Sequence, residues 1–159
     1  MYAELKNILE DIIVGENNFV ANASNFASLL YNNMKEINWV GFYLLSTNEL
    51  ILGPFNGKPA CVRIPYGKGV CGVAAKNRKT MMVDDVHKFP GHIACDPTSN
   101  SEIVIPLIHE NILYGVLDID SPYRNRFGQN DREHLEEFVK LLVENSDMTS
   151  LGRYYKLNH

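Results

Sequence analysis

The chain has 159 residues, the length of one ordinary domain, with 45% hydrophobic and 21% charged residues. A net charge of −4 argues against a nucleic-acid binder, because such proteins usually carry a basic face. No apolar run approaches the ~20 residues of a membrane span, and the first residues lack a secretory pattern. We therefore expect a cytoplasmic protein that associates with neither nucleic acid nor membrane.

The periodicity of apolar residues predicts two amphipathic N-terminal helices, a short helix in the middle and a closing helix, over residues 2–14, 17–36, 70–76 and 131–143. Short β-branched and aromatic runs predict six strands, over residues 39–45, 49–52, 61–64, 81–83, 102–108 and 112–120. Hairpin connections make the sheet mainly antiparallel. The predicted fold class is α+β, with the helices on one face of the sheet.

Two other regions have no regular pattern. Residues 53–59 are rich in turn-forming residues, and residues 149–159 are expected to be a C-terminal tail that follows a single domain, residues 1–148.

The three cysteines, Cys61, Cys71 and Cys95, do not form a disulfide framework by count, because three is odd and the cytosol is reducing. Their spacings fit no common zinc motif, and an Asp-x-Asp pair alone is a weak metal signal, so we expect no metal site. Cys71 begins a predicted helix after Lys68, and both features favour a thiolate. Cys95 lies three residues after His92 in an irregular segment, residues 84–101, whose length is typical of functional loops. Charge thus favours Cys71 as the more acidic thiol and position favours Cys95 as the more accessible one, while a buried, inert role stays open for each.

Alternation along residues 112–120 places Asp118 and Asp120 on one strand face, about 7 Å apart. Their repulsion is ~2.4 kcal/mol at an effective dielectric near 20. Burial, or Glu102 on the neighbouring strand as a third member, would raise the pKa of one carboxyl further. Trp39 and Tyr43 share a face on another strand, with a slot between the two rings. Solvated aspartates and an aromatic core stripe are the alternatives.

Five segments carry a resemblance to a known family. They are LGPFNGKPACVRIP (52–65), GKGVCG (67–72), DVHKFPGHIACD (85–96), SNSEIV (99–104) and GVLDIDSP (115–122). Together they closely resemble the free methionine-(R)-sulfoxide reductases, which are single GAF domains with a six-stranded antiparallel sheet. The resemblance covers roughly residues 17–145 and includes all three cysteines at matching spacing.

The resemblance implies that Cys95 is the catalytic cysteine, that Cys71 is the resolving cysteine, and that Cys61 takes part in disulfide exchange. It also implies substrate contacts at Trp39, Tyr43, Glu102, Asp118 and Asp120. The expected reaction is thiolate attack of Cys95 on the sulfoxide sulfur, giving a sulfenic acid and then a disulfide with Cys71 or Cys61. The family draws electrons from thioredoxin, so no cofactor is expected. The sequence does not reveal the oligomeric state, and a homodimer is a candidate assembly.

An alternative from another functional class is a GAF domain that senses a small molecule without catalysis. A sensor predicts tight binding and a partner domain, for which we expect no room in this chain. A purely structural domain is disfavoured by the carboxyls that share one strand face.

Overall fold

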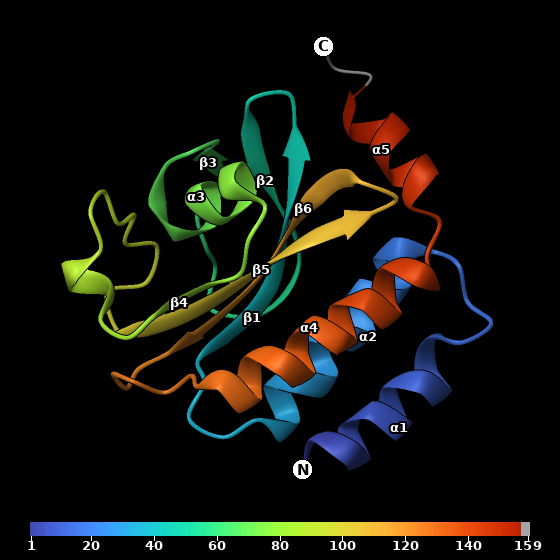
Figure 1. Ribbon diagram of the computed structural model, residues 1–159, viewed down its shortest axis with the longest axis horizontal. Helices are drawn as coiled ribbons and strands as arrows, with labels where there is room; N and C mark the ends of the chain where they lie inside the picture. Colours follow the sequence, from blue (N-terminus) through green and yellow to red (C-terminus); the bar gives the residue numbers. More distant parts are fainter. Residues whose placement is uncertain (157–159) are drawn as a thin grey trace.

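Amphipathic helices begin and end the described chain, residues 1–156, in a computed structural model of the protein (Figure 1). The helices are α1 (Tyr2–Ile13), α2 (Phe19–Asn33), α3 (Gly69–Asn77), α4 (Gln129–Glu144) and α5 (Met148–Lys156), with one 3₁₀ turn, η1 (Val86–Lys88). The strands are β1 (Trp39–Ser46), β2 (Glu49–Gly57), β3 (Arg63–Pro65), β4 (Met81–Val83), β5 (Ser101–His109) and β6 (Ile112–Ser121). No helix of the described residues is long and apolar enough to cross a membrane.

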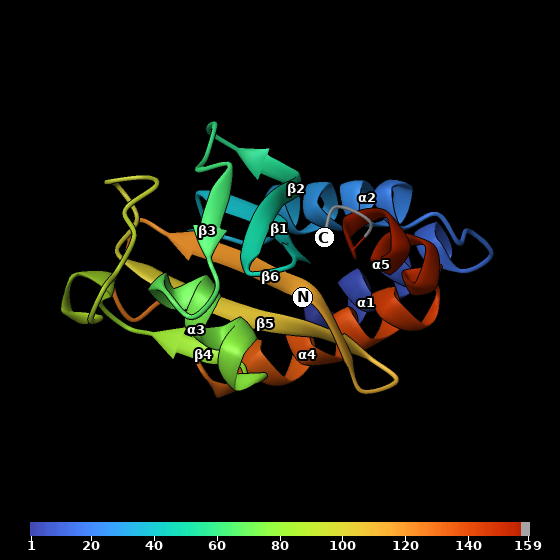
Figure 2. The ribbon, with the colours of Figure 1, turned by 90° about the horizontal axis from the view of Figure 1, so that it is seen from above.

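The six strands form one sheet in the order β3-β2-β1-β6-β5-β4, and every neighbouring pair is antiparallel. Strands β1 and β6 lie at the centre of the sheet and are covered on both faces (Figure 2). The predicted α+β class with a six-stranded antiparallel sheet is confirmed.

The sequence predicted all helices on one face of the sheet, but the structure places helices on both faces. The long helices α1, α2 and α4 cover one face, where Phe42, Leu117 and Ile119 pack into the larger core (Figure 1). The short helix α3 covers the other face, and its Val70 and Ala74 pack with Tyr43 in a second core. The second face carries the polar residues of the site, because Asp118 alternates with Leu117 and Ile119 along β6.

Strand β2 continues through residues 53–57, which the sequence predicted as a turn. The pairing with β1 jumps from Gly41 with Phe55 to Tyr43 with Leu52, so two residues, Gly53 and Pro54, oppose one. Such a bulge tolerates a proline, because the extra residue is not needed for the hydrogen-bond ladder. The strand therefore resumes after the bulge and carries Phe55 to the site.

Residues 149–156, which the sequence analysis expected to be an irregular tail, belong to the helix α5. Met148 and Leu151 are buried in the larger core, and the Ser46 hydroxyl donates a hydrogen bond to the Tyr155 carbonyl at 2.8 Å. The segment has few apolar residues and contains one glycine, so its sequence shows no clear helical periodicity. Residues 157–159, the remainder of the expected tail, lie outside the described residues.

Candidate active site

Three carboxyl groups meet on the sheet face beneath α3. Glu102 of β5 pairs in register with Asp120 of β6, and Asp118 lies two residues before Asp120 on the same strand face. Glu102 and Asp118 are each only 6% exposed. The predicted grouping of the three acids is therefore confirmed, because antiparallel pairing places Glu102 directly beside the two aspartates.

Burial raises the pKa of all three carboxyls, and it is the largest cause in each case. The pKa of Asp118 lies well above its usual range, because Asp120 and Glu102 add repulsion to the burial. The pKa of Asp120 is also raised well above its usual range, by burial and then by Glu102. The pKa of Glu102 is raised by burial, although its contact with Asp118 and the nearby His92 oppose the rise. A carboxyl with a raised pKa keeps its proton to a higher pH than usual, which suits a proton donor.

The Cys71 thiol lies above these carboxyls, and its environment contradicts the expectation of an acidic thiol. Cys71 sits in the first turn of α3, as predicted, but it is only 4% exposed. Its Sγ atom lies 3.8 Å from Glu102 Oε1. Burial, followed by the charges of Asp118 and Glu102, raises the pKa of Cys71 well above its usual value. Desolvation and nearby acids thus outweigh the helix dipole.

The aromatic pair Trp39 and Tyr43 lies on the same sheet face, but it does not leave the open slot that alternation suggested. The two rings stack with centroids 5.8 Å apart, and the Trp39 ring also stacks on Phe55 at 5.3 Å. A Cβ atom at Gly41 would approach the indole to 2.5 Å. The indole therefore fills the space that the glycine leaves, and the two rings form one continuous wall.

Both aromatic side chains also fix the segment that carries Cys61. The Trp39 indole N–H donates to the Lys58 carbonyl at 3.1 Å, and the Tyr43 hydroxyl donates to the Cys61 carbonyl at 2.8 Å. The two bonds tie both ends of residues 58–61 to β1. The rings thus have a structural task that the sequence did not indicate.

A disulfide joins Cys61 to Cys95, with the Cα atoms 5.4 Å apart, and leaves Cys71 as a free, buried thiol. Of the two partners expected for Cys95, the structure pairs it with Cys61 and not with Cys71, which the resemblance implied as the resolving cysteine. Cys61 follows β2 on an irregular segment, whereas Cys71 is held inside α3 beneath the loop. A disulfide needs Cα atoms about 5–6 Å apart. Cys61, on an irregular segment, can approach Cys95 to this distance more easily than Cys71, which is buried in a helix.

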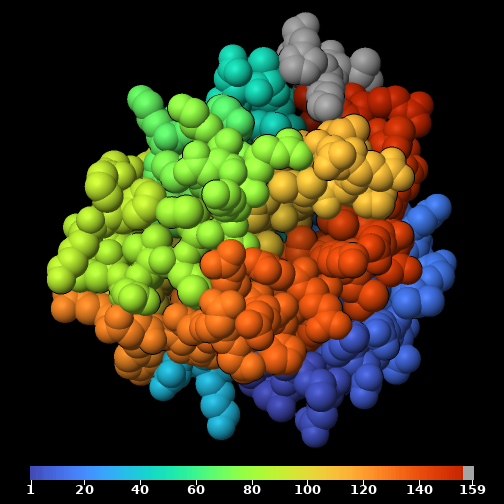
Figure 3. Space-filling view, in the orientation of Figure 1, coloured from blue at the N-terminus to red at the C-terminus, as the bar shows by residue number. Residues whose placement is uncertain are grey.

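The loop that carries Cys95 is held by hydrogen bonds at both ends and by the disulfide at Cys95. At its start, the Asp84 carbonyl accepts from the Asn125 N–H at 3.0 Å, and at its end the Asn100 side chain donates to the Pro122 carbonyl at 2.8 Å. Among the described residues, the hydrogen bonds of residues 89–95 all stay within the loop. Figure 3 shows this yellow-green segment at one edge of the molecule, beside the orange connection between β6 and α4.

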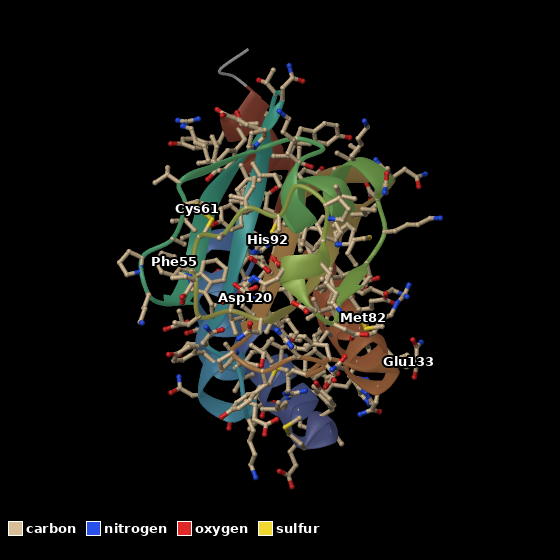
Figure 4. The ribbon with its side chains drawn as sticks, turned by 90° about the vertical axis from the view of Figure 1, so that its left-hand side faces the viewer. Phe55, Cys61, Met82, His92, Asp120 and Glu133 are labelled. Atoms are coloured by element: carbon tan, nitrogen blue, oxygen red, sulfur yellow. A yellow bond between two sulfur atoms is a disulfide. The ribbon has the colours of Figure 1, made fainter. Side chains whose placement is uncertain are left out.

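The disulfide, the loop and the carboxyls enclose one cavity of about 40 Å³, which is also lined by Trp39, Tyr43, Cys71 and Ile93. Viewed from the loop side, Cys61, His92 and Asp120 lie in one region of the face, away from Met82 and Glu133 (Figure 4). The cavity is far smaller than the ~300 Å³ or more of ordinary ligand pockets. With the disulfide closed, this volume holds only a few water-sized groups.

His92 was not among the site residues expected from the sequence, and the contact between Cys71 and Glu102 was not expected either. His92 lines the cavity, and its Nδ1 atom is buried and has no hydrogen-bond partner among the described residues. Cys71 contacts Glu102 directly, whereas the sequence related it only to the other thiols. The signal for both contacts is the position of β5 beneath α3 and the loop, which depends on tertiary packing.

A pocket on an antiparallel sheet, with a disulfide-bonded cysteine pair and buried carboxyls of raised pKa, defines a small α+β domain suited to thiol chemistry on a small ligand. The sequence-family model of the GAF domain matches residues 22–144 of the chain. The free methionine-R-sulfoxide reductase of Escherichia coli is 46% identical, over 97% of this chain and 93% of its own length.

Solved structures agree with the sequence comparison. The free methionine-R-sulfoxide reductase of Staphylococcus aureus in complex with substrate is 53% identical, with a TM-score of 0.87, over 91% of this chain and 94% of that one. The enzyme from Neisseria meningitidis with its substrate is 42% identical, with a TM-score of 0.87, over 91% of this chain and 87% of that one. The chain therefore belongs to the GAF domain family and, within it, to the free methionine-R-sulfoxide reductases.

Proposed function

We propose that the protein reduces free methionine-R-sulfoxide to methionine, with Cys95 as the nucleophile and Cys61 as the resolving cysteine. The observation that carries the proposal is the Cys61–Cys95 disulfide at the rim of a cavity that contains three carboxyls of raised pKa. The relatives named for this activity cover nearly the whole chain, which supports the choice of reaction.

The carboxyl groups favour a free amino acid as the substrate. A free amino acid carries an ammonium group, which the buried acids of β5 and β6 can pair with, whereas the same nitrogen in a peptide is an uncharged amide. Trp39 and Tyr43 form an apolar wall for the methyl-sulfur end. The small, covered pocket suits a free amino acid, because no attached peptide chain has to pass out of the pocket.

The first chemical step transfers oxygen to the protein. Cys95 Sγ attacks the sulfoxide sulfur, and a carboxylic acid of the group protonates the sulfoxide oxygen. The sulfoxide is reduced to the thioether of methionine, and Cys95 is oxidised to a sulfenic acid that carries the oxygen. Asp118 is the proposed proton donor, because its pKa is raised by both neighbouring acids as well as by burial.

The second step closes the disulfide. Cys61 Sγ attacks the sulfenic sulfur of Cys95, and the hydroxyl leaves as water with the proton of the Cys61 thiol. A dithiol reductant, which we propose to be thioredoxin, then returns two electrons by thiol–disulfide exchange and is itself oxidised. We also propose that the protein acts in the cytoplasm, needs no cofactor and forms a homodimer. Light scattering measures the oligomeric state.

A direct test compares substrates and cysteine variants. Reduced protein with a thioredoxin system should form methionine from the free R-sulfoxide but not from the S-sulfoxide or a peptide-bound sulfoxide. Cys95→Ser should be inactive, and Cys61→Ser should form methionine once and then accumulate a sulfenic acid that dimedone traps. Normal turnover by Cys95→Ser would refute the proposal. Binding of the sulfoxide without methionine formation would favour a sensor.

A further inference from the structure

Cys71 is the one thiol that the proposed reaction does not use, and its surroundings are unusual. Its Sγ atom, one carboxylate oxygen of Glu102 and one of Asp118 all lie within 4.8 Å of one another. The three residues come from three elements, α3, β5 and β6, and each is at least nine-tenths buried. A sulfur and two acidic oxygens are thus held together away from water.

The donors of this cluster lack partners of the opposite charge. Among the described residues, neither Glu102 nor Asp118 takes part in a salt bridge. The Oδ1 atom of Asp118 is buried and accepts no hydrogen bond from any described residue. The Nδ1 atom of His92, across the same cavity, is likewise buried and unpartnered. Buried polar atoms without a hydrogen-bond partner are rare in folded proteins, and a bound cation would satisfy those of this cluster.

We propose that Cys71, Glu102 and Asp118 bind a thiophilic divalent cation of the Zn²⁺ and Cd²⁺ class, with water or His92 as the fourth ligand. Thiolate, imidazole and carboxylate are the ligands that zinc takes in proteins. In a tetrahedral site, zinc bonds of about 2.3 Å to sulfur and about 2.1 Å to oxygen place those two ligand atoms ~3.6 Å apart. Cys71 Sγ and Glu102 Oε1 are already 3.8 Å apart. The remaining ligand distances close by rotation of the carboxyl groups.

The position of the cluster predicts the effect of the cation on the enzyme. The same carboxyls line the cavity that is proposed to receive the substrate ammonium, so cation and substrate exclude each other. The disulfide joins Cys61 to Cys95 and leaves Cys71 free, so the cation site exists in both redox states. This competition rests on the proposed function, whereas the binding of the cation does not.

The binding test uses the oxidised protein, in which Cys71 is the free thiol. Titration with Cd²⁺ or Co²⁺ should produce a thiolate-to-metal charge-transfer band that saturates at one ion per chain. Cys71→Ser should lose the band. Glu102→Gln and Asp118→Asn should each weaken binding at least tenfold, while Asp11→Asn, an exposed carboxylate on α1, should leave the affinity unchanged. Circular dichroism of each variant verifies that it is folded.

The absence of a band in folded wild-type protein would overturn the proposal. Equal affinity in wild type, Glu102→Gln and Asp118→Asn would also overturn it, because the thiol would then bind the metal without the carboxyls. For the competition, single turnovers of pre-reduced protein should show Zn²⁺ raising the substrate concentration for half-maximal rate at least tenfold, with the maximal rate unchanged. A band without reductase activity would refute the proposed function alone, and normal activity without a band would refute the cation site alone.

Discussion

Asp118→Asn should make the protein more stable and less active at the same time. The amide resembles the protonated carboxyl in shape but never ionises. In the wild type, ionising both Glu102 and Asp118 places two charges within 4.8 Å, a repulsion of roughly 3.5 kcal/mol at an effective dielectric near 20. The variant removes that repulsion at any pH, and it also removes the proposed proton donor.

The sign of the pH dependence follows from the raised pKa of Asp118. Above the unfolded pKa of ~4, the folded state holds a proton that the unfolded state has lost, so the free energy of unfolding falls as the pH rises. The slope is at most ~1.4 kcal/mol per pH unit for one such proton. Asp118→Asn removes this contribution, so its advantage over the wild type should grow from pH 5 to pH 8.

Urea unfolding at several pH values measures this difference directly, with Asp11→Asn as the matched control on an exposed surface of α1. A gain of 1–3 kcal/mol for Asp118→Asn at pH 8 corresponds to a melting temperature higher by about 2–12 °C. Activity should fall by about 10²–10⁴, the usual contribution of a general acid. If Asp118→Asn is destabilised at pH 8, or if its advantage shrinks as the pH rises, the protonated-carboxyl account is wrong.

Three further predictions concern the thiol pair and the aromatic wall. Reducing the Cys61–Cys95 disulfide opens a loop of sequence separation 34 and should lower the free energy of unfolding by up to ~4 kcal/mol, measured by urea unfolding with and without reductant; an unchanged midpoint would contradict it. Tyr43→Phe loses the bond to the Cys61 carbonyl and should lower stability by about 1 kcal/mol while slowing disulfide closure in stopped-flow thiol assays; closure at the wild-type rate would argue against a positioning role. Gly41→Val should displace the Trp39 indole and lower the free energy of unfolding by about 1–3 kcal/mol. It should also weaken substrate binding, measured by calorimetry. Unchanged stability and unchanged affinity would contradict this prediction.

Sequence patterns predicted most of the sheet because its signals are local. Alternation placed Asp118 on the face opposite Leu117, and hairpin spacing placed Glu102 on the neighbouring strand, as the register has them. The bulge at Pro54 and the helix α5 were missed, because each depends on packing that a short window of sequence does not contain.

The chemistry of the thiols was harder to predict, because it depends on how deeply each thiol is buried in the folded protein. Helix position alone made Cys71 look acidic, whereas burial over Asp118 and Glu102 raises its pKa. The disulfide partner could not be chosen from spacing either, because the distance between Cys61 and Cys95 is set by the Trp39 and Tyr43 hydrogen bonds and by the loop that returns across α3.

The central claim is that substrate oxidises Cys95 and that Cys61 closes the disulfide. Fully reduced protein, with its three thiols, should be mixed with excess free methionine-R-sulfoxide without reductant, and methionine, free thiols and linked peptides should be measured. We predict about one methionine formed and two thiols lost per chain, with Cys61 linked to Cys95 and Cys71 free. A disulfide that contains Cys71, or methionine formed without loss of thiols, would contradict the account.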